Sequence, residues 1–227
     1  MIPQLTWRTT ARISVCALWL SLSACGGGGS SSNADSGTPA PTTSKLSGKV
    51  TYDSVPATLN GLDYRATKEL PVREAIVQAY DLSGTVLAST STDDQGSYQL
   101  VLTPGIKVQV RVQARLLQDG IWDVAVRDNT APAYAVKPDS APVYALTSST
   151  QNINGQDQLL NLHAASGWLD EKYANARSAA PFSILDQAYA AMQKIRQEVP
   201  TLQFPPLNIY WALLHKSAIG QGIPNPK

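Results

Sequence analysis

Cysteine and histidine are scarce in this sequence, and their positions limit the chemistry that the chain can perform. It holds two cysteines and two histidines. Cys16 and Cys25 lie within or just after an apolar N-terminal segment, which leaves no thiol in the rest of the chain. Metal sites need several converging ligands, and His163 and His215 have no second histidine nearby. We therefore expect no metal, no other cofactor, no disulfide and no cysteine nucleophile in the folded part.

Motifs for other kinds of catalysis are also missing. No G-x-S-x-G or S-x-x-K motif places a nucleophilic serine. The run Gly26–Gly29 lacks the lysine and the preceding strand of a phosphate loop. Asp93 and Asp94 lack the further oxygen ligands of a calcium loop, so we expect a turn that hydrogen-bonds its own backbone. The sequence thus predicts no catalytic residues, and we expect that this polypeptide is not an enzyme.

The N-terminus has the features of a secretory signal over residues 1–24. Arg8 and Arg12 are its only charged residues, and an apolar run follows from 13 to 22. That run is too short to cross a bilayer as a helix, which takes about 20 apolar residues. A lipobox-like sequence ends the segment, namely Leu22, Ser23, Ala24 and Cys25.

This ending resembles the lipobox of bacterial lipoproteins, in which the cysteine is acylated and becomes the first residue after cleavage. An ordinary signal peptide with an accidental cysteine is the alternative. Residues 25–44 are rich in Gly, Ser, Thr and Pro and predict a flexible linker behind the lipidated Cys25. The resemblance implies a cell-envelope protein held to the membrane by acyl chains, and Gly26 resembles the signal for outer-membrane sorting.

The charge balance excludes one class of partner. Removal of residues 1–24 takes two of the 18 basic and none of the 17 acidic side chains, so the remaining chain is nearly neutral. Nucleic-acid-binding proteins need a surplus of positive charge. We expect no nucleic-acid partner, and the identity of any protein or carbohydrate partner is left open.

Alternation with a period of two dominates residues 71–116. Apolar side chains occupy every second position from Ile106 to Leu116, which predicts a strand with one buried face. Shorter alternating segments lie around 75–79, 85–91 and 97–102, separated by turn residues. Further strands are expected over Leu46–Asp53, Ile121–Arg127 and Val143–Thr147, and residues 161–168 are expected to be irregular.

The order of these segments resembles the carboxypeptidase-regulatory-like domain. Its features are Leu46–Tyr52, then Pro71–Val77, Thr92–Tyr98 and Pro104-Gly105 before the alternating strand. The resemblance covers about residues 45–116 and implies a transthyretin-like sandwich that is usually a non-catalytic appendage. The fold expected is therefore mainly β with a C-terminal helix: an antiparallel transthyretin-like or Ig-like β-sandwich over 45–150 with a helical extension over 151–227.

The extension contains a change of period. Apolar residues recur at spacings of three and four between Phe182 and Val199, bounded by Pro181 and Pro200. This spacing predicts an amphipathic helix from about 181 to 198. Residues 207–211 then alternate as a strand, but no later segment offers it a partner, which is unusual for an exposed edge.

Residues 121–211 resemble the N-terminal part of a group of bacterial lipoproteins with a zinc-peptidase domain that carries an HExxH helix. The segments concerned are Val126–Asn129, Asn161–Trp168, Ala179–Asp186 and Phe204–Leu207, and no HExxH occurs in this chain. Two hypotheses follow. The chain is either a lipid-anchored, non-catalytic envelope protein that presents an accessory or interaction module, or the N-terminal remnant of such a metallopeptidase, with 151–227 an incomplete domain.

A third hypothesis, a carbohydrate-binding or adhesion module, depends on the aromatic residues. Trp122, Trp168 and Trp211 are the candidates for stacking on a sugar, although core or rim positions are more common for such side chains. His163 lies among small residues, and we expect a structural, hydrogen-bonded histidine rather than a site residue.

Overall fold

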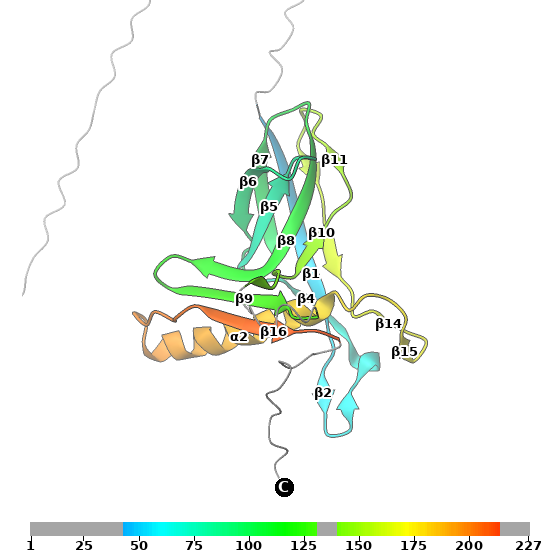
Figure 1. The fold of residues 1–227 in the computed structure, drawn as a ribbon, viewed down its shortest axis with the longest axis vertical. Helices are drawn as coiled ribbons and strands as arrows, with labels where there is room; N and C mark the ends of the chain where they lie inside the picture. Colours follow the sequence, from blue (N-terminus) through cyan, green and yellow to red (C-terminus); the bar gives the residue numbers. More distant parts are fainter. Residues whose placement is uncertain (1–42, 131–139, 214–227) are drawn as a thin grey trace, which may run out of the picture. The chain divides into compact units, whose positions relative to one another are not determined.

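Strand β1 (Ser44–Ser54) is the centre of the first sheet of the computed structural model, which describes residues 43–130 and 140–213. Its side chains alternate between buried and more exposed positions, as the sequence predicts. Both edges of β1 are paired, two strands running antiparallel on one side and two running parallel on the other (Figure 1). The antiparallel strands are β7 (Ser97–Leu102) and β4 (Lys68–Pro71), and the parallel ones are β12 (Gln158–Leu159) and β13 (Leu162–Ala164).

The second sheet is built on β8 (Lys107–Gln118). Every second side chain of β8 is buried, including Val108, Val110 and Val112. The strands of its main path run in the order β16-β9-β8-β5-β6, and two short strands also pair with β8. These strands are β5 (Ala75–Tyr80), β6 (Val86–Ser91), β9 (Trp122–Asp128), β10 (Ala145–Thr147), β11 (Gln151–Asn152) and β16 (Leu207–Trp211).

Two small hairpins project from these sheets. One pairs β2 (Ala57–Thr58) with β3 (Gly61–Leu62), and the other pairs β14 (Trp168–Leu169) with β15 (Lys172–Tyr173). A short 3-10 helix, η1 (Tyr64–Ala66), follows β3.

Helix α2 (Ala179–Glu198) is the one α-helix among the residues that the structure describes. It begins two residues before the predicted start, and its last turn ends just before Pro200, which cannot continue a helix. One face is buried through Phe182, Leu185, Tyr189 and Met192. The prediction of a mainly β protein with a C-terminal helix is therefore confirmed.

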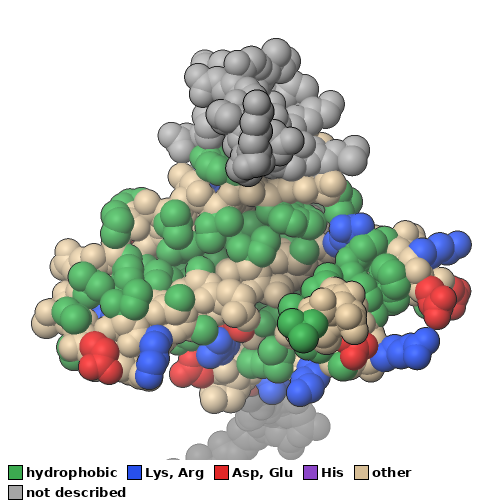
Figure 2. Space-filling model, turned by 90° about the horizontal axis from the view of Figure 1, so that it is seen from below, with side chains coloured by type: hydrophobic (Ala, Val, Ile, Leu, Met, Phe, Trp, Pro, Cys, Tyr) green, Lys and Arg blue, Asp and Glu red, His purple; other side chains and the backbone are tan. Residues whose placement is uncertain are grey.

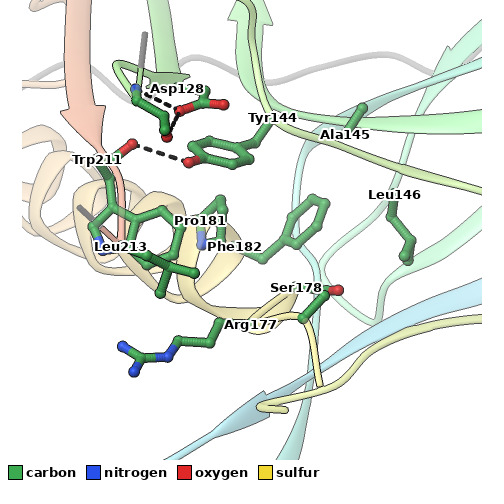
Figure 3. Close-up of a pocket in the computed structure, with 12 residues that line it drawn as sticks. Asp128, Tyr144, Ala145, Leu146, Arg177, Ser178, Pro181, Phe182, Trp211 and Leu213 are labelled. Atoms are coloured by element: carbon green, nitrogen blue, oxygen red, sulfur yellow. Dashed lines mark hydrogen bonds between the residues drawn. The ribbon is translucent and has the colours of Figure 1, made fainter. Parts of the chain in front are cut away.

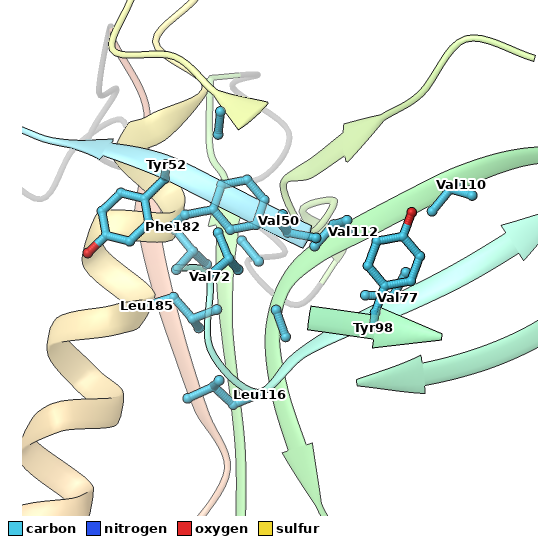
Figure 4. Close-up of a cluster of buried hydrophobic side chains, with 14 of the residues drawn as sticks. Val50, Tyr52, Val72, Val77, Tyr98, Val110, Val112, Leu116, Phe182 and Leu185 are labelled. Carbon is cyan, nitrogen blue, oxygen red and sulfur yellow. The ribbon is translucent and has the colours of Figure 1, made fainter. Parts of the chain in front are cut away.

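A single hydrophobic cluster fills the space between the sheets and the helix. Figure 4 shows Phe182 and Leu185 of α2 beside Tyr52 and Val72, with the valines of β8 further along the same cluster. Side chains from before residue 128 and from 153 to 192 thus share one core. The core strands and the helix stabilise each other through this shared burial.

The parallel strands can lie against β1 because Gly48 has no side chain. A Cβ at Gly48 would lie 1.8 Å from the carbonyl oxygen of Leu160. The Leu160 amide donates to the Ser47 carbonyl at 2.8 Å, and the Tyr98 hydroxyl donates to the Leu160 carbonyl at 2.7 Å. Glycine is required here by close backbone approach.

Two expectations were wrong. The segment 161–168 is not irregular throughout, because Leu162–Ala164 pairs with β1 in a parallel register. Strand β16 is not without a partner, because it runs parallel to β9 with Leu207 opposite Val124 and Trp211 opposite Asp128. Both pairings are parallel and distant in sequence, and alternation within a strand does not indicate which edge it joins.

A partly buried ion pair joins α2 to the connection between β4 and β5. The Arg73 guanidinium lies 2.7 Å from Asp186 of α2, with side chains 28% and 10% exposed. The Tyr52 hydroxyl donates to the other carboxylate oxygen at 2.9 Å. Burial, together with the negative charge of Asp186, raises the pKa of Tyr52 well above its ordinary value, so this hydroxyl stays a donor.

We predict that Asp186→Ala lowers the free energy of unfolding by about 2–3 kcal/mol, because it leaves the Arg73 charge and the Tyr52 hydroxyl unpaired in a largely buried place. The matched control is Asp123→Ala, which removes a bidentate pair to Arg115 whose side chains are 30% and 33% exposed. That variant should lose about 1 kcal/mol or less. Urea unfolding measures both, and equal losses would contradict the anchoring role of Asp186.

Candidate functional site

A cavity of about 420 Å³ opens between the first turn of α2, strand β16 and the segment that leads into β10. We name it the α2–β16 cavity. Figure 3 shows Tyr144, Phe182 and Trp211, from these three elements, around the same space. Leu146, Pro181 and Leu213 add further apolar surface, and Asp128 and Arg177 are the charged residues that line it.

Hydrogen bonds hold the aromatic wall of the α2–β16 cavity in place. The Tyr144 amide donates to Val126, and the Tyr144 carbonyl accepts from Ala114, so both sides of its backbone are fixed to the second sheet. Its hydroxyl donates to the Trp211 carbonyl at 3.0 Å, and the two rings lie 5.3 Å apart. Burial, and secondarily the Asp128 charge, raises the pKa of Tyr144 far above its ordinary value. The wall is therefore uncharged at neutral pH.

A second cavity of about 220 Å³ adjoins the first, because Arg177 and Trp211 line both. Its surface is more mixed. Asp53, Ser166 and Ser183 supply polar atoms, and Tyr64 and Tyr173 supply rings.

An aromatic cluster supports this adjoining cavity. Tyr64 stacks on Trp168 with ring centroids 3.8 Å apart, and Tyr173 meets both rings edge-on. The hydroxyls of Tyr64 and Tyr173 are hydrogen-bonded to each other. Burial, together with this bond, raises the pKa of Tyr64 to about 12. The cluster links η1 to the hairpin of β14 and β15. It also fixes the Tyr173 ring, against which Arg177 lies.

Arg177 is the shared charge of the two cavities. Its guanidinium carbon lies 3.2 Å from the centroid of the Tyr173 ring, a cation–π contact. Within the described ranges 43–130 and 140–213, no carboxylate lies within 4.0 Å of its guanidinium. Figure 3 shows Arg177 at the edge of the α2–β16 cavity.

The three predicted tryptophans do not form one surface. Trp122 is 6% exposed and meets Tyr189 edge-on in the core. One face of Trp168 is covered by Tyr64. Of the three, only Trp211 lines the α2–β16 cavity. The structure therefore provides no shared stacking platform of Trp122, Trp168 and Trp211.

His163 lies on β13, outside both cavities. Its Nδ1 is 2.9 Å from the Thr51 hydroxyl and its Nε2 is 3.2 Å from Asp53. Both ring nitrogens of His163 thus contact a neighbouring polar side chain. In the described part of the chain no three His, Cys, Asp or Glu side chains are grouped as a metal site would require, and no helix there is long and apolar enough to cross a membrane.

Cys25 and the preceding Leu22, Ser23 and Ala24 lie outside the described residues, as does His215. The Asp93 turn is observed as expected: its carboxylate accepts from the amides of Gln95 and Ser97.

Comparison with known proteins gives no family. No family model and no curated protein matches the chain. Among solved structures, it is similar to a DUF3823 family protein from Parabacteroides merdae ATCC 43184, at 15% identity and a TM-score of 0.26 over 54% of this chain. It is also similar to a 9R-lipoxygenase from Cyanothece PCC8801, at 11% identity and a TM-score of 0.27 over 59% of this chain. The match spans 46% of the first protein and 18% of the second, and scores this low support no inference from either.

The sequence pattern did not indicate Tyr144 or Arg177 as site residues. Tyr144 follows a proline-spaced segment without clear periodicity, and Arg177 precedes the helical pattern by only a few residues. Phe182 was expected on the apolar stripe of the helix, but this stripe does not distinguish a cavity wall from core. Arg177 could have been singled out only as a basic residue directly before the small residues that begin the helix.

A second charged cluster lies away from the cavities, around Glu74. This residue has a backbone φ of 55°, in the left-handed region. Burial, followed by the charges of Asp94 and Asp93, raises the pKa of Glu74. Asp94 itself accepts a hydrogen bond from Tyr189 at 2.9 Å. The ionised carboxylate of Glu74 is therefore less favourable in the folded chain than in the unfolded one.

We predict that Glu74→Gln stabilises the protein at pH 7 by on the order of 0.5 kcal/mol, a small value because solvent screens this site. At pH 3.5, below the ordinary glutamate pKa, Glu74 is protonated in both states and the substitution should have no effect. The penalty appears as the pH rises through the raised pKa of the folded state. Glutamine keeps the backbone strain unchanged, so urea unfolding at the two pH values isolates the charge.

The control for this pH effect is Glu69→Gln, at an exposed position on β4. It measures the effect of removing a solvent-exposed glutamate under the same conditions. A Glu74→Gln effect that is independent of pH would show that charge is not its cause.

Proposed function

We propose that this chain is a non-catalytic protein of the bacterial cell envelope. Its lipid anchor would be attached at Cys25. The observation that carries the proposal is the sequence Leu22-Ser23-Ala24-Cys25 at the end of a short apolar segment that follows Arg8 and Arg12. Two or more acyl chains hold a protein firmly on a membrane, whereas one chain binds only marginally. Gly26 after the cysteine supports outer-membrane sorting.

The domain that follows is suited to presentation on a tether. The residues between Cys25 and the first strand are rich in Gly, Ser, Thr and Pro, a composition typical of linkers. The resemblance of residues 45–116 to the carboxypeptidase-regulatory-like domain supports an accessory role. The α2–β16 cavity, walled by neutral aromatic side chains, supports binding of a ligand or partner.

The rival hypothesis of a peptidase remnant is less well supported. If the rest of a peptidase domain were missing, the apolar faces of α2 and β16 that normally pack against it should be exposed. Phe182, Leu185 and Tyr189 of α2 are at most 3% exposed, and β16 is paired along five residues with β9, although Ile195 at the end of the helix and Leu207 of β16 are 46% and 49% exposed. Because most of the apolar face of α2 is covered within this chain, we favour a β domain that is stable with its helix over a remnant.

Lipidation is tested in a Gram-negative host fed an alkyne analogue of palmitate. We predict that the wild-type protein takes up the label and sediments with membranes, and that Cys25→Ser abolishes labelling. The matched control is Cys16→Ser, which changes the other cysteine of the chain inside the expected signal and should leave labelling intact. Label on the Cys25→Ser variant, or an unlabelled wild-type protein, would refute the anchor.

A further inference from the structure

The α2–β16 cavity has the size and surface of a small-molecule site. Its 420 Å³ lies within the usual range for ligand pockets, about 300–1,000 Å³. Most of its lining is apolar, with Tyr144, Phe182 and Trp211 forming the aromatic part. Neutral rings and aliphatic side chains favour an apolar ligand body, because burial removes its surface from water.

The charges around the cavity are not equivalent. Asp128 accepts from the amide and the hydroxyl of Thr130 through one of its two carboxylate oxygens. Asp53, in the adjoining cavity, accepts from the Ser166 amide at 2.7 Å and lies 3.2 Å from His163. Arg177, by contrast, contacts an aromatic ring and has no carboxylate within 4.0 Å among the described residues.

An arginine held in this way can still bind an anion. Its cation–π contact with Tyr173 fixes one face of the guanidinium, while its N–H groups remain suited to a planar carboxylate. Arg177 lines both cavities, so an anionic group bound there would lie at the junction of the apolar and the more polar space.

We propose that the α2–β16 cavity binds a small amphiphile with one carboxylate, whose apolar body lies among Tyr144, Phe182 and Trp211 and whose carboxylate pairs with Arg177. Apolar surface alone would accept any hydrophobic molecule, whereas the cation selects those that carry a negative group. This proposal does not depend on lipidation of Cys25, and its test omits that residue.

The face of the molecule in Figure 2 carries many exposed hydrophobic side chains, which suits a ligand that arrives from an apolar environment. Hydrophobic side chains are spread over this face, and most of the charged ones lie toward its lower and right margins. Leu213, which lines the cavity, is 57% exposed.

The test is calorimetric titration of sodium octanoate and, separately, octan-1-ol into the chain from residue 26 onward, which contains all of the described residues. We expect saturable binding of octanoate at one site and weaker binding of the alcohol. Arg177→Gln should weaken octanoate binding roughly ten- to hundredfold, as expected for loss of a hydrogen bond to a charged group. It should change octanol binding less than about twofold.

Three further variants localise the effect. Arg177→Lys keeps the charge and should restore part of the octanoate affinity. Ala176→Trp, at an exposed lining position, should block both ligands by filling the cavity. The matched control is Arg65→Gln, which removes an arginine that is 92% exposed and lines neither cavity, and octanoate affinity should not change.

The proposal is overturned if octanoate does not bind, if Arg177→Gln binds octanoate as tightly as the unsubstituted chain, or if octanoate binding survives Ala176→Trp. Thermal melts of each variant show that loss of binding is not loss of fold. Because the titrated chain lacks Cys25, failure here leaves the lipid anchor standing, and failure of lipidation leaves the cavity standing.

Discussion

The ion pair between Arg73 and Asp186 is the constraint on which the arrangement of the helix depends. An amphipathic helix packs on a sheet by non-directional burial, which fixes its distance better than its position along its axis. The carboxylate of Asp186 adds direction, since one oxygen meets Arg73 and the other meets the Tyr52 hydroxyl of β1. With that point held, Phe182 lies about one turn before Asp186, and Phe182 and Pro181 become part of the wall of a cavity.

Strand β1 ties the later part of the chain to the first sheet. It pairs along both edges, so the chain must return to it after more than a hundred residues to supply β12 and β13. Gly48 permits that return by leaving room for the Leu160 carbonyl. The last third of the described chain is thereby tied to the first strand by backbone hydrogen bonds as well as by the helix, and the two attachments share one core.

Local pattern predicted much of this fold but little of the site. The alternation of β8 and the three-and-four spacing in α2 are properties of single elements, and both were read correctly because burial imposes them within one segment. The parallel pairing of β16 with β9, and of Leu162–Ala164 with β1, depends on which edges remain open after the rest has folded. Tyr144, Arg177 and Trp211 meet only through those pairings, so their proximity has no counterpart in sequence spacing.

The position of the cavity follows from the same geometry. The cavity lies beside the first turn of α2, where the backbone enters the helix from a loop. In this chain the residues at that point are rings from three elements with one cation at their edge, held by Tyr173. Core packing alone would favour aliphatic side chains that close the gap. An open, aromatic gap lined by one cation and one carboxylate at the joint between helix and sheet is better explained by a ligand than by stability. The cavity, and not the tryptophans as a group, is therefore the place to look for function.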